Sequence, residues 1–532
     1  MILSVENLSH SYGDRVLFEN ISFNVEEGDK YGIIGVNGTG KSTLLRLIAN
    51  REAGAGKLTI PGGIVMEYLP QDPPFEAEAT VLEQVFKGDS PLMVLLRDYE
   101  LAVEAMNANP DDDRLQRRLL DLQQQMDNEY AWQLESEAKA VLTQLGITNL
   151  QQKMGELSGG QRKRVALAGV LVRPSDLLIL DEPTAVLTPQ EVTELFVELK
   201  KLRDMGHTIV FISHKLNEVK ELCDSFTILR RGRTVAVGNV NDYTEQELSN
   251  MMVGRDVSLE VEKGAPAGEK REALRVENLY YNSVSGKQLL QSVSFSLYRG
   301  RILGVAGVEG NGQKELSEIL TGLRSFTRGE ITLEGESVKG KSVRQIRQMG
   351  ISNISEDRMT YGCAPTMSVT DNIIADRYYS GKYSHGIRLN VKAIRHDVEE
   401  LVKTFDVVCP GTASMSGMLS GGNIQKMIAA REFTSGARVI VANQPTRGID
   451  VGSSEFIHQQ LVRLAREQDA AVLLVSADLT ELLQLSDSLI VMFGGEITAY
   501  FPDSREVNDL MLGEYMLGVR KMTAEEIQEA LQ

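Results

Sequence analysis

The feature that most constrains the fold of this chain is a long stretch that occurs twice. Residues 17–40 read LFENISFNVEEGDKYGIIGVNGTG, and residues 289–312 read LLQSVSFSLYRGRILGVAGVEGNG. A later segment is repeated too, because LSGGQRKRVALAGVLVRPSDLLILDEPT at 157–184 returns as LSGGNIQKMIAAREFTSGARVIVANQPT at 419–446. Two copies of this length in a chain of 532 residues predict a tandem duplication of one large domain rather than a solenoid.

Each copy has the residue pattern of an α/β domain with a mainly parallel sheet. It begins with alternating apolar residues, as half-buried strands do, and continues through an apolar run into a glycine-rich turn and a helix. Buried-strand runs then alternate with helical segments; they read DLLILD and TIVFIS in the first copy, RVIVAN and AVLLVS in the second. In such folds, ligands bind at the carboxyl edge of the sheet.

Composition limits the classes of function. Lys and Arg number 56 against 74 Asp and Glu, and a formal net charge of −18 argues against general nucleic-acid binding. Cys223, Cys363 and Cys409 have no metal-ligand spacing, so we expect reduced thiols. No apolar run is long enough to cross a bilayer and the N-terminus lacks a signal pattern, so we expect a cytoplasmic protein that serves a membrane only from its surface.

The glycine-rich turn of the first copy fits the phosphate-binding pattern GxxxxGK[ST], with Gly35, Gly40, Lys41 and Ser42 at the defined positions. Glycines let backbone N–H groups close around phosphates, the lysine neutralises phosphate charge, and the serine hydroxyl ligates Mg²⁺. The pattern alone also occurs by chance. Here it follows a predicted strand and opens a predicted helix, which favours a functional loop.

Further candidate residues stand near the ends of other strands. Asp181 is expected to hold Mg²⁺ and Glu182 to polarise the attacking water, although a strand that ends in two solvated acids is the alternative. His214 is a candidate contact to the γ-phosphate, and Gln71 in YLPQD is a candidate for positioning water and metal. Tyr12 is a candidate for stacking on adenine.

The segment LSGGQ at 157–161 is expected to open a helix. Ser158, Gly159 and Gly160 would then present backbone donors at the helix N-terminus, where anions bind. Without the other motifs, a simple helix cap followed by a glycine turn would explain this segment equally well.

Taken together, the P-loop, the glutamine, LSGGQ, LDEPT and a histidine in this order resemble an ATP-binding cassette (ABC) ATPase, and the resemblance covers both copies. It implies two tandem P-loop NTPase domains, each with a parallel sheet core, an antiparallel β subdomain and a helical subdomain. In that family, cassettes pack head to tail, and each ATP lies between one P-loop and the other cassette's LSGG.

The resemblance therefore implies one catalytic ATP site with Mg²⁺ as its metal. From the first cassette it would take Tyr12, Gly35, Asn37, Gly38, Thr39, Gly40, Lys41, Ser42, Thr43, Gln71, Asp181, Glu182 and His214, and from the second Ser420, Gly421 and Gly422. Ser42, Gln71 and Asp181 would be the residues at the metal, and Glu182, His214 and Gln71 the catalytic ones.

The second copy lacks the same chemistry. Gln313 stands in the place of the P-loop lysine and Lys314 in that of the serine; Asn443 and Gln444 replace the Asp-Glu pair, and Ala477 replaces the histidine. Because these changes affect metal, water and γ-phosphate together, we expect a degenerate site that holds nucleotide without cleaving it. Its residues would be Gly307, Gly310, Gly312 and Gln313, with Ser158, Gly159 and Gly160 of the first cassette.

Two parts of the chain resemble different branches of this family. Residues 1 to 184 resemble the first cassette of the soluble ABC-F translation factors, in SYGDRVLFENISF, EYLPQD and the polar helical segment 97–145. From DEPTAVLTPQEV onward the chain resembles the ATPase subunit of nucleoside or simple-sugar importers, in GVEGNGQKEL, SEDR and NQPTRGIDVG. A natural recombinant, an engineered fusion and an assembly artefact would each give such a mosaic.

These observations predict the organisation and role of the chain. We expect cassette 1 at 1–255 with a helical subdomain at 90–160, a linker at 256–273, cassette 2 at 274–520 and a C-terminal tail at 521–532. The importer-like part is the larger, so we expect an ATP-hydrolysing subunit on the inner face of the cell membrane. Its partners would be permease subunits and a substrate-binding protein for nucleosides or simple sugars. A ribosome-associated ABC-F-like ATPase and an uncoupled mosaic ATPase are the alternatives.

Overall fold

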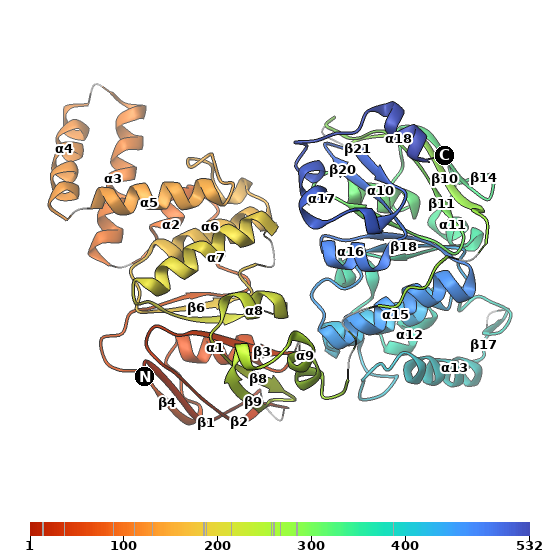
Figure 1. The fold of residues 1–532 in the computed structure, drawn as a ribbon, viewed down its shortest axis with the longest axis horizontal. Helices are drawn as coiled ribbons and strands as arrows, with labels where there is room; N and C mark the ends of the chain where they lie inside the picture. The colour runs from red at the N-terminus through yellow and green to blue at the C-terminus, as the bar shows by residue number, and fades with distance from the viewer. Residues whose placement is uncertain are drawn as a thin grey trace. The chain divides into compact units, whose positions relative to one another are not determined.

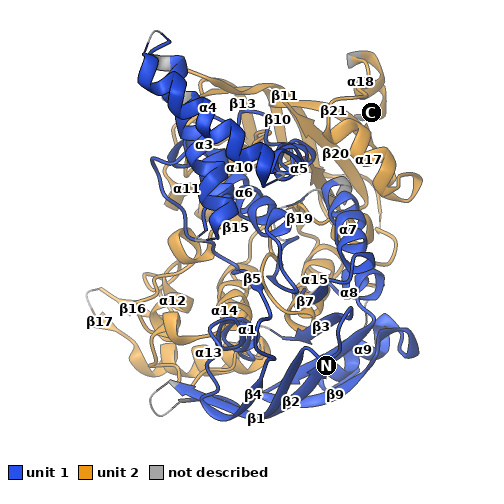
Figure 2. Ribbon diagram, turned by 90° about the vertical axis from the view of Figure 1, so that its left-hand side faces the viewer, with its two compact units in different colours: residues 1–256 blue, residues 257–532 orange. Residues whose placement is uncertain are grey.

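The computed structural model describes all but a few of the 532 residues. The residues outside the description are 13–14, 37, 89, 111, 130, 185–186, 188, 214, 257, 259–260, 267, 284–285, 387 and 532. The chain divides into two compact units, Met1–Asp256 and Val257–Gln532, which Figure 2 distinguishes by colour.

The first unit is built around a six-stranded sheet with the order β5-β6-β7-β3-β8-β9. Its strands are β5 (Met66–Leu69), β6 (Leu177–Asp181), β7 (Thr208–Ile212), β3 (Lys30–Gly35), β8 (Ser225–Arg230) and β9 (Arg233–Asn239). All neighbours are parallel except β8 and β9. Strands β3, β6 and β7 are buried along their whole length, as continuous apolar runs predict for central parallel strands. The predicted parallel α/β core is confirmed.

A smaller antiparallel sheet of the first unit has the order β2-β1-β4. Its strands are β1 (Leu3–Tyr12), β2 (Arg15–Val25) and β4 (Ala55–Thr59). Apolar side chains of β1 and β2 share one hydrophobic core with α1 (Lys41–Ala49) and with β3, β6 and β7. The antiparallel sheet is therefore packed against the end of the unit where the phosphate-binding pattern lies.

The remaining helices of the first unit include a helical region inserted between β5 and β6. The helices are α2 (Val81–Val85), α3 (Pro91–Ala108), α4 (Asp113–Asn128), α5 (Ala131–Gln144), α6 (Gly159–Val172), α7 (Pro189–Asp204), α8 (Leu216–Leu222) and α9 (Glu245–Val253). Helices α3 and α4 lie side by side (Figure 1). Asp112 caps α4 by accepting from the Arg114 N–H at 2.8 Å, and Leu122 and Met126 are buried. Short 3₁₀ turns cover Met154–Glu156 and Val240–Asp242.

The second unit repeats this architecture, which confirms the predicted duplication. Its six-stranded sheet has the order β15-β18-β19-β12-β20-β21, again parallel except for the last pair. The strands are β15 (Ile351–Ile354), β18 (Val439–Asn443), β19 (Ala471–Val475), β12 (Ile302–Ala306), β20 (Ser488–Phe493) and β21 (Glu496–Phe501). Since the strand orders correspond one to one, the carboxyl ends of equivalent strands carry the equivalent residues of the two units.

Antiparallel strands and helices complete the second unit. The four-stranded sheet β11-β10-β13-β14 comprises β11 (Gln288–Tyr298), β10 (Glu272–Asn282), β13 (Arg328–Leu333) and β14 (Glu336–Ser337), and a hairpin pairs β16 (Ser384–His385) with β17 (Arg388–Leu389). The helices are α10 (Gln313–Leu320), α11 (Val343–Met349), α12 (Val369–Ile374), α13 (Val391–Thr404), α14 (Gly421–Phe433), α15 (Val451–Gln468), α16 (Leu479–Leu485), α17 (Asp509–Met516) and α18 (Ala524–Leu531). A π-helical turn spans Arg358–Gly362, and 3₁₀ turns span Ser416–Met418 and Ser504–Glu506.

Two segments outside the repeated core are packed onto the second unit. Within the stretch expected as a linker, Lys263 Nζ donates to Ser486 O at 2.5 Å and to Ser504 Oγ at 3.1 Å. Within the stretch expected as a tail, α18 lies against β21, and Ile527 and Ala530 pack on the core (Figure 1). Both segments therefore belong physically to this unit.

Candidate active site

The phosphate-binding pattern of the first unit forms a tight loop between β3 and α1. Gly35 ends β3, and a side chain there would place its Cβ 2.3 Å from Leu229 O. Gly40 precedes α1 with φ of 92°, a left-handed conformation that favours glycine. The two glycines of the pattern are therefore required by close backbone approach and by backbone conformation.

The lysine of this loop points back into it. Lys41 is 5% exposed, and its Nζ donates to Gly35 O at 2.7 Å and to Val36 O at 3.1 Å. Thr39 Oγ1 donates to the same Val36 oxygen at 2.8 Å. The ammonium group thus lies inside the curve of the loop, where the phosphates of a nucleotide bind in loops of this type.

Asp181 is a buried carboxyl group at the end of β6. It is 2% exposed, and neither carboxylate oxygen has a hydrogen-bond partner of good geometry among the described residues. Burial raises the pKa of Asp181 to about 6, and the nearby Glu182 charge adds to this rise, whereas the Ser42 hydroxyl and the Lys41 ammonium lower it. A carboxylate in this state has unsatisfied oxygens suited to a hard cation.

Glu182 occupies the next position in a strained backbone conformation. Its φ of 51° is left-handed, and its N–H donates to Ile212 O at 3.1 Å, which ties it to the end of β7. Gln71 Nε2 donates to Glu182 Oε2 at 3.1 Å. The structure therefore brings the predicted glutamine and the predicted catalytic acid together, although 111 residues separate them in the chain.

For the other predicted residues of the first unit, the structure describes only some of the positions or side chains. Asn37 and His214 lie outside the described residues, and for Tyr12 the structure describes the backbone, at the end of β1, but not the side chain. Ser42 is exposed at the start of α1, next to half-buried Thr43. Gly38 is exposed in the loop with a φ of 81°.

Both LSGG segments form helix N-termini, as predicted for the first of them. Ser158 caps α6: its Oγ accepts from the Gln161 N–H at 3.2 Å, and the Gln161 side chain accepts from the Ser158 N–H at 2.9 Å. Ser420 caps α14 by accepting from Asn423, whose Nδ2 lies 2.9 Å from Ser420 Oγ. Gly159 and Gly160 begin α6, and Gly421 and Gly422 begin α14.

The second unit keeps the form of the loop with different side chains. Gly312 precedes α10 with φ of 103°, and Gln313, 7% exposed, donates from Nε2 to Val308 O at 3.2 Å. Gln313 therefore contacts the loop backbone from the place that Lys41 has in the first unit, but it has no formal charge. Gly307 and Gly310 have positive φ values of 155° and 94° in the same loop.

The strand ends of the second unit keep their backbone geometry too. Gln444 has φ of 52°, and its N–H donates to Val475 O at 2.7 Å, as that of Glu182 does to Ile212 O. Its Oε1 accepts from the Ala477 N–H at 3.2 Å. Asn443, which stands where Asp181 does, is 5% exposed. The backbone is thus retained at positions where the acids and the histidine are replaced.

Sequence reasoning missed a buried acid close to the strand ends of the first unit. Glu218, on α8, is 4% exposed and accepts hydrogen bonds from Thr184 and Ser213 near the ends of β6 and β7. The internal repeat contained the signal: SHKLNE at 213–218 and SADLTE at 476–481 share the serine and the glutamate although the histidine is lost.

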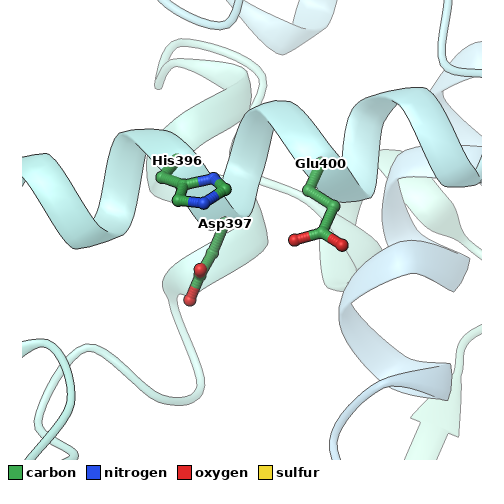
Figure 3. A group of neighbouring side chains, drawn as sticks. All are labelled: His396, Asp397 and Glu400. Carbon is green, nitrogen blue, oxygen red and sulfur yellow. The ribbon is translucent and has the colours of Figure 1, made fainter.

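A separate group of potential metal ligands lies on α13 of the second unit. His396, Asp397 and Glu400 have ligand atoms within 4.8 Å of one another (Figure 3). Asp397 is already engaged, because it pairs with Lys382 and accepts from Tyr383 Oη at 2.7 Å. Those two contacts lower the pKa of Asp397 against the opposing effect of burial. His396 and Glu400 are exposed, so the group has the character of a solvated, charged helix face.

Comparison with known proteins gives matches for both units. The profile of the family described as ABC transporter matches residues 18–185 and 290–447. A glucose import ATP-binding protein of Haloferax volcanii is 35% identical, over 98% of this chain and 96% of the relative. A nucleoside import ATP-binding protein of Lactococcus lactis is 32% identical (96% and 98%), and a guanosine import ATP-binding protein of Bacillus subtilis is 33% identical (97% and 97%).

Solved structures support the fold alone. The archaeal ribosome recycling factor aABCE1, solved with the ribosomal stalk protein aP1, aligns with a TM-score of 0.61 at 16% identity, over 96% of this chain and 92% of that one. A structure described as RNase-L Inhibitor aligns with a TM-score of 0.58 at 17% identity, over 97% and 92%. Among the described helices, none is both long and apolar enough to span a membrane.

Proposed function

The chain belongs to the ABC transporter family of ATP-hydrolysing proteins, and on this premise we propose that it is the energy-coupling subunit of an importer for nucleosides or simple sugars. The observation that carries the proposal is the set of import ATP-binding relatives, each at least 32% identical and matched along at least 96% of this chain. Permease subunits and a substrate-binding protein would be its partners, at the inner face of the membrane.

The catalytic site of this proposal is built on the first unit. Glu182 polarises the attacking water, with Gln71 holding one of its oxygens and His214 at the γ-phosphate. The P-loop, residues 35–43 with Lys41, holds the phosphates, and Tyr12 stacks on adenine.

Magnesium fits the donor set of the first unit. Among the described residues, the oxygens of Asp181 have no hydrogen-bond partner of good geometry. With the adjacent Ser42 hydroxyl and the Gln71 amide, they form a set of hard oxygen donors of the kind that Mg²⁺ prefers. When bound, the ion would neutralise charge on the β- and γ-phosphates. The chain's own residues hold this group: β6 presents Asp181, α1 presents Ser42, and the segment after β5 presents Gln71.

The second unit has a supporting role in this proposal. Ser420, Gly421 and Gly422 complete the ATP site of the first unit, following the head-to-tail pairing of the family. The site with Gly307, Gly310, Gly312 and Gln313, completed by Ser158, Gly159 and Gly160, is degenerate. The neutral Gln313 and the loss of the acid pair at Asn443 and Gln444 support nucleotide retention without cleavage there.

A ribosome-associated ATPase is the main alternative. The polar helices α3–α5 favour it, but the likeness to the ribosome recycling factor, at 16% identity, extends to the fold alone. The whole-chain match to import proteins favours the importer, and it weakens the third possibility, an ATPase without a productive partner.

Two variants and two co-purifications test the proposal. Glu182→Gln is expected to abolish multiple-turnover hydrolysis while ATP still binds, and Lys41→Ala is expected to weaken binding itself. A tagged chain should bring down membrane subunits from a detergent extract and should not sediment with ribosomes. Multiple turnover in Glu182→Gln would refute the catalytic assignment, and ribosome co-sedimentation without membrane subunits would refute the importer assignment.

A further inference from the structure

A buried carboxylate of the first unit lies between the ends of two neighbouring strands. Glu218 Oε2 accepts hydrogen bonds from Thr184 Oγ1 at 2.7 Å and from Ser213 Oγ at 2.6 Å. Lys215 Nζ lies 3.3 Å from the other oxygen, Oε1. All of the hydroxyl partners are themselves buried, Thr184 at 4% and Ser213 at 1% exposure. A carboxylate bound by charge-assisted hydrogen bonds in such surroundings holds its partners in one geometry.

The two hydroxyl groups belong to the segments that carry the proposed chemistry. Thr184 follows Glu182 by two residues, and Ser213 directly precedes His214 in the chain. The parallel pairing of β6 with β7 ends at Asp181 and Ile212. Beyond that point the Glu182 N–H still reaches Ile212 O, and the side chain of Glu218 joins the two segments again.

The second unit contains a related arrangement without the chemistry. Glu481, 3% exposed, accepts from Thr446 Oγ1 at 2.8 Å, as Glu218 does from Thr184. Ser476 Oγ accepts from the Asp478 N–H at 3.0 Å, as Ser213 Oγ does from the Lys215 N–H at 3.1 Å. Glu481 additionally contacts His458 Nε2 at 2.8 Å. The second unit therefore keeps the bond between threonine and glutamate at strand ends that have lost both acids and the histidine, and His458 contacts the same oxygen of Glu481.

From this geometry we infer that Glu218 is a positioning residue in ATP hydrolysis. It fixes the position of the turn that carries Glu182 relative to Ser213, the residue before His214. The inference rests on the proposed roles of Glu182 and His214. A displacement of reacting groups by about 1 Å can lower a rate by about a hundredfold, so a link across two strand ends can control catalysis without contacting ATP. In the second unit the bond between Thr446 and Glu481 has no catalytic acid to position.

Removal of single hydroxyl groups tests this inference with little disturbance of the fold. Thr184→Val and Ser213→Ala each delete one partner of Glu218, and Thr446→Val and Ser476→Ala are the matched controls in the second unit. We expect the first pair to lower kcat at least roughly tenfold with KM for ATP changed less than about twofold, because binding groups stay in place. The controls should leave kcat near that of the unmodified chain.

Two further variants separate positioning from general stabilisation. In the double variant Thr184→Val/Ser213→Ala, the kcat loss should be smaller than the product of the single losses, since both act through one carboxylate. Glu218→Gln keeps an acceptor oxygen and should recover much of the kcat that Glu218→Leu loses. Thermal unfolding and binding of a fluorescent ATP analogue, measured on every variant, show that folded protein is being compared.

The outcomes distinguish this inference from the proposed function. Unchanged kcat in Thr184→Val and Ser213→Ala, with Glu182→Gln inactive, would overturn the inference and leave the catalytic assignment intact. Equal kcat losses in the second-unit controls would also overturn it, because the link would then be purely structural. Turnover by Glu182→Gln would instead remove the premise itself.

Discussion

Asp181 shows at the scale of one residue how a functional site opposes stability. Burial raises its pKa from 3.8 to about 6, so the folded chain binds this proton more tightly than the unfolded chain does. Without a cation, the stability contributed by the protonated form is present at low pH and is lost as the pH rises from 4 to 6. This pKa shift corresponds to at most about 3 kcal/mol of free energy of unfolding, at about 1.4 kcal/mol for each pKa unit.

Replacement of Asp181 by asparagine tests this linkage. In magnesium-free buffer, Asp181→Asn should raise the melting temperature at pH 8 and change it much less at pH 4, where the carboxyl group is protonated in the folded chain and close to half protonated in the unfolded chain. Calorimetry at the two pH values measures the effect. Asp121→Asn is the control, because Asp121 is exposed on α4, away from this site. An equal loss of stability at both pH values would show that shape, rather than charge, governs this position.

Gln71 acts at the same scale through a single hydrogen bond. Its Nε2 lies 3.1 Å from Glu182 Oε2, so Gln71→Leu leaves that oxygen without this donor. We expect kcat to fall roughly tenfold while ATP binding, which depends on the P-loop, stays within about twofold. Steady-state ATPase assays and nucleotide titration provide the two readouts. Weakened binding at unchanged kcat would place Gln71 at the nucleotide rather than at the acid.

At the scale of elements, the features that could be predicted are those that a short stretch of sequence encodes. Central strands such as β6 and β18 are continuous apolar runs, and the P-loop is a short pattern with glycines at fixed spacing, so both were recognised. The contacts of Gln71 with Glu182 and of Glu218 with Thr184 and Ser213 were not predicted. They depend on the register of β5, β6 and β7, which pairs residues far apart in the chain and leaves no periodic signal.

The second loop supplies the prediction at this scale. The double substitution Gln313→Lys/Lys314→Ser restores the pattern of the first loop on a backbone that already has its curvature. We expect tighter nucleotide binding at the second site, because an ammonium and a hydroxyl are added at the phosphates. In a Glu182→Gln background, ATP turnover should remain absent, since Asn443 and Gln444 still replace the acids. Photolabelling with an azido-ATP followed by peptide mapping separates the two sites, and turnover in that background would contradict the account.

At the scale of the whole molecule, the stretch expected as a linker is packed onto the second unit. The charged, Gly/Pro-containing stretch up to residue 273 reads as a flexible linker, because its composition resembles that of exposed chain. In the structure the division falls at Asp256. Lys263 reaches Ser486 and Ser504, and Arg466 Nε donates to Lys263 O at 2.9 Å, so tertiary contacts hold this stretch on the second unit.

We therefore predict that the second unit requires this stretch for full stability. A fragment of residues 257–532 should melt at a higher temperature than one of residues 272–532, by about 2–4 °C for each kcal/mol that the lost contacts contribute. Lys263→Met in the longer fragment should reproduce part of the loss, because it removes the hydrogen bonds to Leu483 O, Ser486 O and Ser504 Oγ. Burial lowers the pKa of Lys263, and the charge of Asp487 opposes this effect. Glu262→Ala, at an exposed neighbour, is the control and should have no effect. Equal melting temperatures for the two fragments would mean that the units are joined by a free linker after all, with no contribution from Lys263 to the fold.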